Sequence, residues 1–479
     1  MNVDFSLFIP EFVMAGMALV VLTVDLFLPQ DRKHWLPYIA LVGILGTMGS
    51  VFTIAGKSEE LYGGLFLVDN FAVFFKVFLL AVGAFMVLAS AEYVKKNLTR
   101  PGEFYGILLF SILAMMTMTA AGELLTAYIS LELFSFSLYI LAAYAIHRPK
   151  SVEAGLKYIL VGAFSSAILL YGLSLIYGSL GTTTFSGISD ALAGNDDIPV
   201  AFLAGLVLVI VGFGFKITAV PFHMWAPDVY EGAPTPVTAY LAVASKAVSF
   251  ALLLRLFAMA FGPALEEWRP IIAGLAAATI VLGNLVAMAQ HNIKRMLAYS
   301  SIGQAGYLLM GIAALSPLAS NGLLFHIVGY SAANFAAFAC VIAYENLTGK
   351  QEISDYAGLS RRQPFMALVL SGALFSLAGL PVFAGFATKF YLFAAVGNEG
   401  LLWLVIVAVA GSLVSLYYYL MVIKQIYLGE PEEDEPLRLS VSTSGLLAAL
   451  GAAVVIFGVY PGPLIKLIEK ATAVLPMPV

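Results

Sequence analysis

The sequence predicts an all-α polytopic membrane protein of about 14 transmembrane helices, built from two inverted five-helix repeats that each contain a discontinuous helix. Three observations support this fold class. The 479 residues are 61% hydrophobic and only 11% charged, whereas a soluble domain is about half apolar and about a quarter charged. Apolar windows of about 20 residues, enough to span a bilayer, recur along the chain. Two of these windows are interrupted by proline, which is typical of membrane helices that break beside an ion path.

The apolar windows give the expected elements in chain order. Helices are predicted at 5–28, 36–56, 70–91, 104–121, 123–146, 153–179, 199–226, 235–261, 269–289, 293–315, 320–345, 364–396, 400–428 and 441–461. The first window carries acidic residues and no basic start, so we interpret it as a membrane helix and not as a signal peptide. We interpret 1–479 as a single membrane domain, with N-terminal helices in 1–100, a first repeat in 104–261, a second in 269–428 and a C-terminal helix in 441–461.

Each predicted repeat contains one broken helix. Lys216 precedes Pro221 in the first, and Pro381 precedes Lys389 in the second. Proline removes a backbone hydrogen bond and clashes with the preceding helical turn. The helices are therefore expected to break near Pro221 and Pro381, close to a buried lysine in each case.

A weak internal similarity and the loop charges complete the topology. AYISLELFSFSLY (127–139) resembles AYSSIGQAGYLLM (298–310), which favours an internal repeat. With the N-terminus outside, thirteen Lys and Arg residues fall in inner loops and four in outer segments, as the positive-inside rule requires. An even helix count then places both termini outside. We expect a bacterial plasma (inner) membrane, or a thylakoid or other energy-coupling membrane.

Composition and motifs exclude several functions. The net charge of −5 gives no basic footprint for nucleic acid, and the single cysteine, Cys340, excludes a disulfide within the chain. The sequence lacks a Walker loop, a dinucleotide-binding glycine motif and any Cys or His cluster. We therefore expect no cofactor and no metal on this chain, and membrane lipids around it.

Charged residues inside the apolar windows are the strongest functional signal. Each costs about 3 kcal/mol at bilayer depth on insertion scales, so such residues usually face water, a partner or a transported ion. Together they suggest a route for protons or cations. They are Lys76, Glu132, Lys157, Lys216, Lys246 and Lys389.

The position of each charge in its window decides between relay and simpler roles. Glu132 should pair with a cation or take up a proton, and a plain helix–helix ion pair is the alternative. Lys216, Lys246 and Lys389 lie well inside their windows, so snorkelling to the surface is the lesser alternative for them. Lys157 is close to a window end, where snorkelling or an ion pair with Glu153 competes with a relay role.

Four further residues have simpler alternatives of their own. Lys76, near a helix start, is expected to snorkel, and Arg255 would be a fixed countercharge because arginine rarely deprotonates. His223 could pass protons or cap the backbone freed by the break. His326 could be a relay group or a hydrogen-bonded core histidine.

The residues around His223 resemble a known family. GFGFKITAVPFHMWAPDVYEGAPTPVTAYLAVASKA (212–247) resembles the signature segment of antiporter-like membrane subunits of respiratory complex I and of Mrp-type cation/proton antiporters. MLAYSSIGQAGYLLMG (296–311) is similar to a second stretch, and the resemblance covers roughly 100–430. Within the family the chain most resembles the subunit N branch of NADH-quinone oxidoreductases, with subunit 2 of NAD(P)H dehydrogenase a close counterpart. Lys389 fits this branch, whereas His326 resembles subunits L and M.

The resemblance implies a role for each buried charge. Glu132 and Lys216 match the carboxylate–lysine pair of the family, Lys246 its connecting residue and Lys389 its terminal residue on the exit side. Lys157 matches an additional lysine of subunit N. When Glu132 and Lys216 pair, the lysine stays charged, and when they separate its proton is less favoured and can move toward the other lysines.

The resemblance also implies an activity and partners. It describes a proton-translocating membrane-arm subunit of a NADH-quinone oxidoreductase, with no redox catalysis of its own. FMN, iron–sulfur clusters and quinone are then expected in partner subunits, with subunits M and K adjacent. The alternatives are an Mrp-type antiporter subunit, or a membrane subunit of a related hydrogenase or ferredoxin- or F420-linked oxidoreductase.

Overall fold

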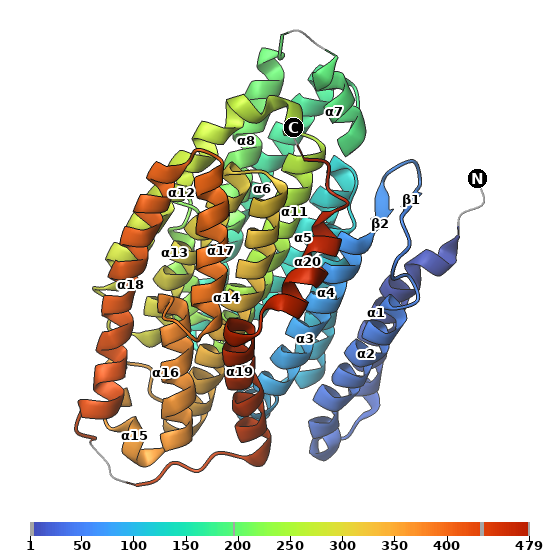
Figure 1. Cartoon of the computed structure of the whole chain (residues 1–479). Helices are drawn as coiled ribbons and strands as arrows, with labels where there is room; N and C mark the ends of the chain where they lie inside the picture. Colours follow the sequence, from blue (N-terminus) through green and yellow to red (C-terminus); the bar gives the residue numbers. More distant parts are fainter. Residues whose placement is uncertain (1–3, 195–196, 432–434, 478–479) are drawn as a thin grey trace. The chain divides into compact units, whose positions relative to one another are not determined.

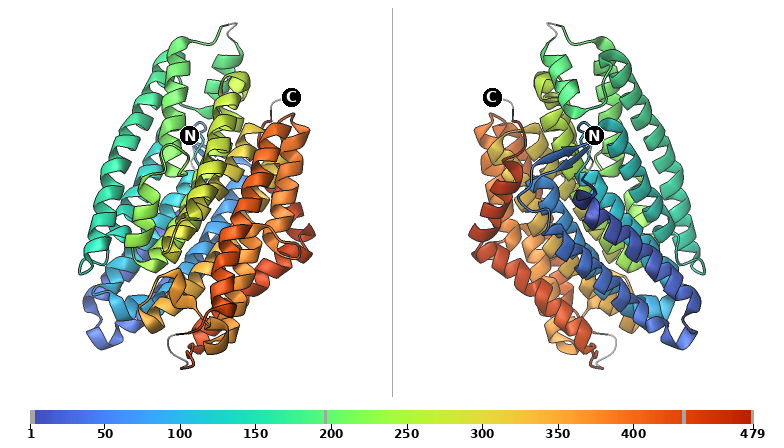
Figure 2. Two further views of the ribbon diagram at one scale, coloured as in Figure 1. Left: turned by 90° about the vertical axis from the view of Figure 1, so that its left-hand side faces the viewer. Right: turned by 90° about the vertical axis from the view of Figure 1, so that its right-hand side faces the viewer.

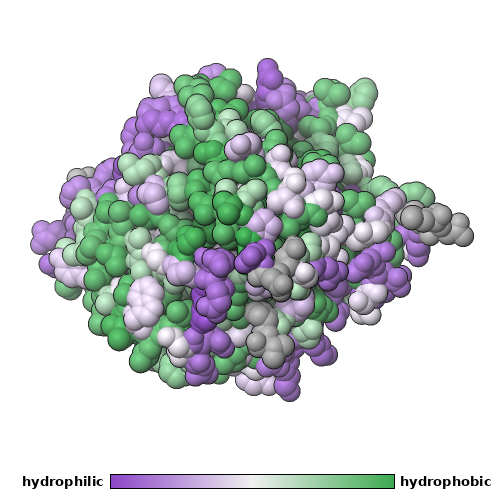
Figure 3. All heavy atoms as spheres, turned by 90° about the horizontal axis from the view of Figure 1, so that it is seen from above, coloured by the Kyte–Doolittle hydropathy of each residue, from purple (hydrophilic) through white to green (hydrophobic). Residues whose placement is uncertain are grey.

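The protein is a helical membrane protein, as expected. The computed structural model describes residues 4–194, 197–431 and 435–477. Among these residues, eleven helices are long and apolar enough to cross a membrane, and α8 (Val200–Lys216) and α16 (Pro364–Ala378) are shorter apolar helices. Figure 1 shows the helices in chain order, and Figure 3 shows hydrophilic residues gathered in patches at one end of them. The expected total of 14 crossings stays a prediction.

The chain divides into two compact units. Unit 1 comprises Met1–Ile217, Ala244–Ile271 and Leu467–Val479, and unit 2 comprises Thr218–Val243 and Ile272–Lys466. The single membrane domain and the inverted repeats stay predictions. Lys216, beside the first break, lies in unit 1, and Lys389, beside the second break, lies in unit 2.

Unit 1 is organised around long apolar helices that begin at the N-terminus. Helices α1 (Ile9–Phe27), α2 (Leu36–Val51), α3 (Asn70–Asn97) and α4 (Pro101–Thr119) pack on one another, and the right-hand view of Figure 2 shows α1 and α2 side by side. The remaining elements are η1 (Phe5–Phe8), η2 (Gln30–Trp35), α5 (Leu124–Ala142), α6 (Pro149–Leu180), α7 (Phe185–Ala193), α8, α11 (Lys246–Met259), η4 (Gly262–Ala264), the start of α12 and the end of α20 (Gly462–Thr472).

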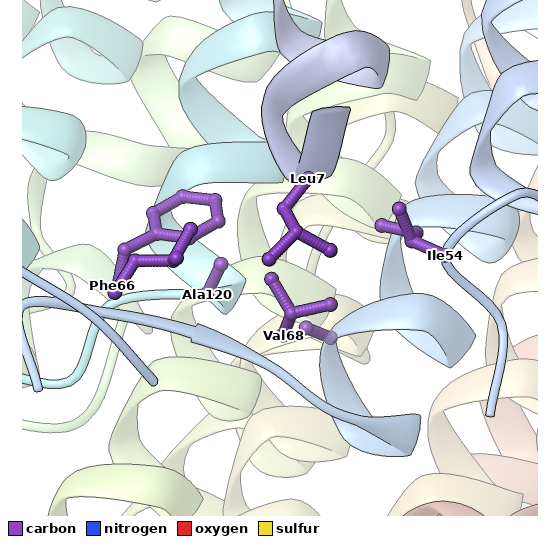
Figure 4. Packing of buried hydrophobic residues seen from close by; sticks show 7 residues of the cluster. Leu7, Ile54, Phe66, Val68 and Ala120 are labelled. Atoms are coloured by element: carbon purple, nitrogen blue, oxygen red, sulfur yellow. The ribbon is translucent and has the colours of Figure 1, made fainter. Parts of the chain in front are cut away.

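A short hairpin closes one end of the N-terminal helices. Strands β1 (Glu59–Leu61) and β2 (Phe66–Val68) pair antiparallel, and their apolar side chains join the hydrophobic cluster drawn in Figure 4. Leu7 and Ile54 approach Phe66 and Val68 there, and Ala120, directly after α4, lies between Phe66 and Val68. Burial of these groups holds the hairpin against the helix ends.

Two buried ion pairs fix α3, and one corrects an expectation. Asp69 caps α3 through Ala72 N–H at 2.8 Å and binds Arg255 at 2.8 Å. Burial raises the pKa of Asp69, but the charge and hydrogen bonds of Arg255 outweigh it and hold the pKa below its usual value. The expectation that Lys76 snorkels is wrong. Lys76 is fully buried, with Nζ 2.7 Å from Glu11 Oε1, because α1 supplies a carboxylate inside the protein.

Unit 2 is organised around α14 (Pro317–Thr348). Of the residues in its membrane-length apolar stretch, 94% are buried, against 33% for α18 (Leu402–Leu428) and 22% for α19 (Val441–Val459). Helix α14 therefore forms the centre of unit 2, and the other two helices lie at its edge. The remaining elements are α9 (Trp225–Gly232), α10 (Thr235–Tyr240), the rest of α12 (Leu265–Ala287), α13 (Ile293–Ala313), η5 (Ile353–Tyr356), α15 (Leu359–Arg362), α16 and α17 (Ala384–Asn398). The π-helical turn η3 (Leu241–Ser245) joins α10 to α11.

Candidate functional site

The first break places Lys216 at the end of a helix. Helix α8 ends at Lys216, Thr218 adopts a positive φ of 61°, and helix resumes only at Trp225 in α9. Pro221 lies within this interruption and has no N–H to continue a helical ladder. The lysine side chain therefore stands at a helix terminus, inside an otherwise apolar segment.

Lys216 reaches a polar cluster supplied by α5 and α6. Its side chain is 7% exposed, and Nζ donates to Ser135 Oγ at 2.7 Å. Longer contacts of 3.4 Å join Nζ to Tyr139 OH and Ser166 Oγ, and Glu132 Oε1 lies 3.6 Å away. The expected carboxylate–lysine pair is thus present, at the long end of ion-pair distances.

Ser166 closes the gap between the two charges. Its hydroxyl donates to Glu132 Oε1 at 2.6 Å while it accepts from Lys216 Nζ at 3.4 Å. A hydroxyl can donate and accept at once. The chain from ammonium to hydroxyl to carboxylate is therefore an unbroken hydrogen-bonded path along which a proton can be exchanged.

Glycines bring α6 and α8 close enough for this path. A Cβ at Gly172 would lie 2.7 Å from the carbonyl oxygen of Gly205, and a Cβ at Gly205 would lie 2.7 Å from that of Gly172. A Cβ at Gly212 would lie 2.6 Å from Leu169 Cβ. Small residues at such positions let membrane helices approach backbone to backbone. Ser166 and Lys216 meet because their helices touch at these points.

The second break places Lys389 against a helix end. Helix α16 ends at Ala378, and α17 begins at Ala384. Lys389 Nζ donates to the carbonyls of Leu377 at 2.8 Å and Ala378 at 3.3 Å, and to Ser412 Oγ at 3.1 Å. An ammonium has three donors, and these contacts use all of them. The charge also meets the negative end of the α16 dipole.

The four last carbonyls of α16 all find donors, which explains why the break is stable in an apolar setting. Gly379 N–H reaches Phe375 and Ser376, and Leu380 N–H also reaches Phe375. Lys389 satisfies the remaining two, and Ser412 Oγ donates to the last of them at 2.9 Å. A helix end without such partners is strongly unfavourable inside a membrane.

Two glycines make this geometry accessible. Gly379 has a φ of +91°, which L side chains rarely adopt. A Cβ at Gly385 would lie only 1.7 Å from the carbonyl oxygen of Ser376. The start of α17 can therefore pass the end of α16 only with glycine at residue 385.

His326 is linked to the same helix end. Its Nδ1 lies 3.0 Å from Thr388 Oγ1 and its Nε2 lies 3.1 Å from Gln304 Oε1. Gln304 donates its amide to the Leu377 carbonyl at 3.2 Å, so its oxygen faces the ring and Nε2 is the donor. The Thr388 hydroxyl also donates to the Gly385 carbonyl at 3.3 Å, and both ring nitrogens of His326 have a hydrogen-bond partner. A carbonyl shared by Gln304 and Lys389 connects this histidine to the lysine.

The other predicted residues fall in different surroundings. Lys246 is 2% exposed and directly follows η3 at the start of α11. Lys157 is 44% exposed and pairs with Glu153 at 2.7 Å, which is the ion pair expected from their spacing. His223 is buried beyond the first break, and its Nδ1 has no hydrogen-bond partner within the described part of the chain. The relay roles of these three residues stay predictions.

Several hydroxyl groups of the site were not singled out from the sequence. Ser135 and Tyr139 follow Glu132 by three and seven residues, so helical periodicity alone would have placed them on its face. Ser166 and Ser412 lie on other helices, and no local pattern marks them. Among the described residues, no group of three or more His, Cys, Asp or Glu side chains could hold a metal ion.

Two interrupted helices among the membrane-length helices each place a buried lysine among hydrogen-bond partners. This arrangement defines the class of antiporter-like membrane subunits. The family profile described as NADH:quinone oxidoreductase/Mrp antiporter, TM, matches residues 121–415. The chain belongs to this family, and its curated relatives include proteins named NADH-quinone oxidoreductase subunit N. It is 44% identical to that of Moorella thermoacetica, over 95% of each chain, and 43% identical to that of Desulforamulus reducens, over 98% of each.

Solved structures share the fold over almost the full length. A chain of respiratory complex I from Thermus thermophilus with bound aureothin matches with a TM-score of 0.81 at 30% identity, covering 96% of this chain and 100% of that one. A chain of the Mrp complex from Dietzia sp. matches with a TM-score of 0.84, covering 97% of each, but at 22% identity it shows the fold alone. The family expected from the sequence is confirmed.

Proposed function

We propose that this chain is a proton-translocating membrane-arm subunit of a NADH-quinone oxidoreductase. It acts as part of a multisubunit enzyme, in which partner subunits carry FMN, iron–sulfur clusters and the quinone reaction. Its own contribution is to move protons, coupled through the protein to electron transfer elsewhere. The relatives at 43–44% identity, all named as subunit N, support the parent complex.

The single observation that carries the transport role is the Lys216–Ser166–Glu132 path. It holds one ammonium and one carboxylate at a 3.6 Å separation, bridged by a hydroxyl, in an apolar unit. A pair meant only to join helices would be expected at direct hydrogen-bond distance, like Lys76 and Glu11 at 2.7 Å. The looser geometry leaves Lys216 able to change partners.

Charge movement follows from the electrostatics of this pair. While Glu132 is near and ionised, it favours the charged form of Lys216. When the carboxylate withdraws or is protonated through Ser166, that support is lost and the ammonium can release its proton. Lys246 and Lys389 are the proposed later stations, with Lys389 as the last one, where backbone carbonyls and Ser412 replace a carboxylate as its partners.

We also propose a membrane location and neighbouring subunits for the chain. We place the chain in the bacterial plasma membrane, with both termini outside, and beside subunits M and K of the membrane arm. The resemblance to the subunit N branch and the positive-inside distribution of loop charges support this placement. No cofactor is assigned to this chain.

The decisive test is to tag the chain in its native host, purify it in mild detergent and identify the proteins that co-purify. We expect flavin and iron–sulfur subunits, and NADH oxidation that drives proton transport after reconstitution into liposomes. Recovery with small membrane subunits only, together with cation/proton exchange driven by an ion gradient without NADH, would instead support an Mrp-type antiporter. The assay should include sodium-free buffer, so that proton and sodium transport are separated.

A further inference from the structure

The ammonium of Lys389 lies in unit 2 without a carboxylate partner. None of the ion pairs among the described residues includes it, and its hydrogen bonds go to two backbone carbonyls and the Ser412 hydroxyl. Lys216 differs, because Glu132 lies 3.6 Å from its Nζ. A positive charge in an apolar setting is costly unless nearby groups compensate it. Lys389 is therefore expected to have a further stabilising neighbour.

The aromatic ring of Tyr307 is such a neighbour. Lys389 Nζ lies 4.8 Å from the centroid of this ring. The face of an aromatic ring carries partial negative charge and attracts a cation within about 6 Å. Tyr307 is fully buried and Lys389 is 4% exposed, and the attraction is strongest between groups that are shielded from water. The ring face can therefore compensate part of the charge.

The ring of Tyr307 is oriented through its hydroxyl. Asn284 Nδ2 donates to Tyr307 OH at 3.3 Å and to the Ile280 carbonyl at 2.8 Å. Tyr418 OH donates in turn to Asn284 Oδ1 at 3.1 Å. Both ends of the amide are thus engaged, by α12 on one side and α18 on the other. A fixed amide holds the Tyr307 hydroxyl, and with it the plane of the ring.

Neighbouring helices also pack against the ring of Tyr307. The ring centroids of Phe393 on α17 and His326 on α14 lie 5.6 Å and 6.2 Å from that of Tyr307. On α18, a Cβ at Gly411 would lie 3.3 Å from Tyr307 OH and 2.5 Å from Ile280 Cγ2. Helix α18 can therefore approach the hydroxyl this closely only with glycine at residue 411. The ring has little room to turn away from the ammonium.

The groups that face Lys389 come from several helices of unit 2. The titratable ones are Tyr307 on α13 and His326 on α14. Helix α16 presents two carbonyls and α18 presents Ser412, and α19, which packs on α17, contains no titratable residue. The charge of Lys389 is therefore held by neutral groups, of which the Tyr307 ring is the aromatic one.

We propose that the ring face of Tyr307 stabilises the charged form of Lys389, and so serves unit 2 as Glu132 serves Lys216 in unit 1. Tyr307 is a positioning residue that helps Lys389 to keep its proton until the next step of transport, and it carries no proton itself. The inference rests on the proposed function, because it assigns Lys389 to the proton path. The electrostatic character of the ring should then set the pH range in which the complex pumps.

Two variants separate the ring face of Tyr307 from its bulk. Tyr307→Phe keeps the face and is the reference. Tyr307→Leu removes the face but stays apolar, so Lys389 should hold its proton only at lower pH. We expect the pH at which pumping is half-maximal, on the alkaline side, to fall by about one unit relative to Tyr307→Phe. The measurement is NADH-driven proton transport by the intact complex in vesicles as a function of pH.

A fluorine series tests the ring without changing its shape. Residue 307 is replaced by phenylalanines with one, two or three ring fluorines, which withdraw negative charge from the ring face. Each added fluorine should lower the pH of half-maximal pumping further. The same series at Phe325, a buried ring that packs against Tyr391, is the matched control and should give no trend.

The outcomes distinguish this inference from the proposed function. A pH profile that does not change with fluorination at residue 307 would overturn the role of the Tyr307 ring, and so would a Tyr307→Leu profile equal to that of Tyr307→Phe. Normal pumping by Lys389→Met would instead remove Lys389 from the proton path, and the proposed role of Tyr307 would fall with it.

Discussion

Ser166 donates a hydrogen bond to Glu132 at 2.6 Å, and the same hydroxyl lies 3.4 Å from the ammonium of Lys216. The lysine and the carboxylate are therefore joined mainly through a third group, and their direct separation is 3.6 Å. In this arrangement a change in one hydroxyl alters the coupling between two charges.

Ser166→Ala should weaken proton pumping while the complex still assembles. Loss of a hydrogen bond to a charged group costs about 1.5–3 kcal/mol, which corresponds to about a tenfold or greater fall in the rate of a step that depends on it. Ser165→Ala is the matched control, because the neighbouring hydroxyl donates only to the Gly212 carbonyl. The measurement is NADH-driven acidification of inverted membrane vesicles. Equal pumping by both variants would remove Ser166 from the path.

Lys389→Arg separates a structural cation from a proton carrier. Arginine stays charged in proteins and can still donate to the Leu377 and Ala378 carbonyls, so assembly should be retained while pumping falls about tenfold or more. Lys389→Met should lose pumping and also destabilise the end of α16, by about 0.5–1.5 kcal/mol for each hydrogen bond lost, because Gln304 and Ser412 still donate to the Leu377 and Ala378 carbonyls. Thermal unfolding of the purified complex reports the second effect. Full pumping by Lys389→Arg would show that Lys389 serves only as a helix cap.

Gly385→Ala should prevent correct packing at the second break. The added Cβ would lie 1.7 Å from the Ser376 carbonyl oxygen, so the two half-helices would have to move apart and the contacts of Lys389 would be lost. We expect little assembled complex in the membrane. Gly397→Ala is the control on the same helix, since its nearest neighbour would be 4.0 Å away. It should be neutral or stabilise the helix by up to about 1 kcal/mol.

Lys76→Met should be strongly destabilising although the residue lies outside the proposed path. Removing one partner of a buried pair leaves an uncompensated charge and costs about 3–5 kcal/mol. The double variant Glu11→Gln/Lys76→Met should recover most of this loss. Arg100→Gln, which breaks an ion pair that is 69% and 49% exposed, should change stability by less than about 1 kcal/mol. A melting temperature unaffected by Lys76→Met would contradict the buried pair.

The charged residues in apolar segments could be identified from the sequence, because the free-energy cost of burying a charge depends on the segment that contains it. Glu132 and Lys216 stand out on this ground alone, and the structure brings them together. Proline and glycine near Lys216 and Lys389 likewise signal broken helices, because both act on the backbone locally. Each of these features can be recognised within a single segment of the sequence.

Partners that come from distant segments could not be predicted. Ser166 is 34 residues from Glu132, and its role depends on how closely α6 approaches α8. Lys76 has the sequence position of a snorkelling lysine, and only the packing of α1 on the same unit supplies Glu11.

The central claim is that Lys216 carries protons, and the most direct test is the number of protons translocated per NADH oxidised by the complex containing Lys216→Met. Lys57→Met, at an exposed residue just before β1, is the matched control for loss of a lysine. We expect an assembled complex in which Lys216→Met lowers this ratio or slows turnover with it, while Lys57→Met behaves as the unaltered protein. An assembled Lys216→Met complex with an unchanged ratio and rate would show that Lys216 does not carry protons.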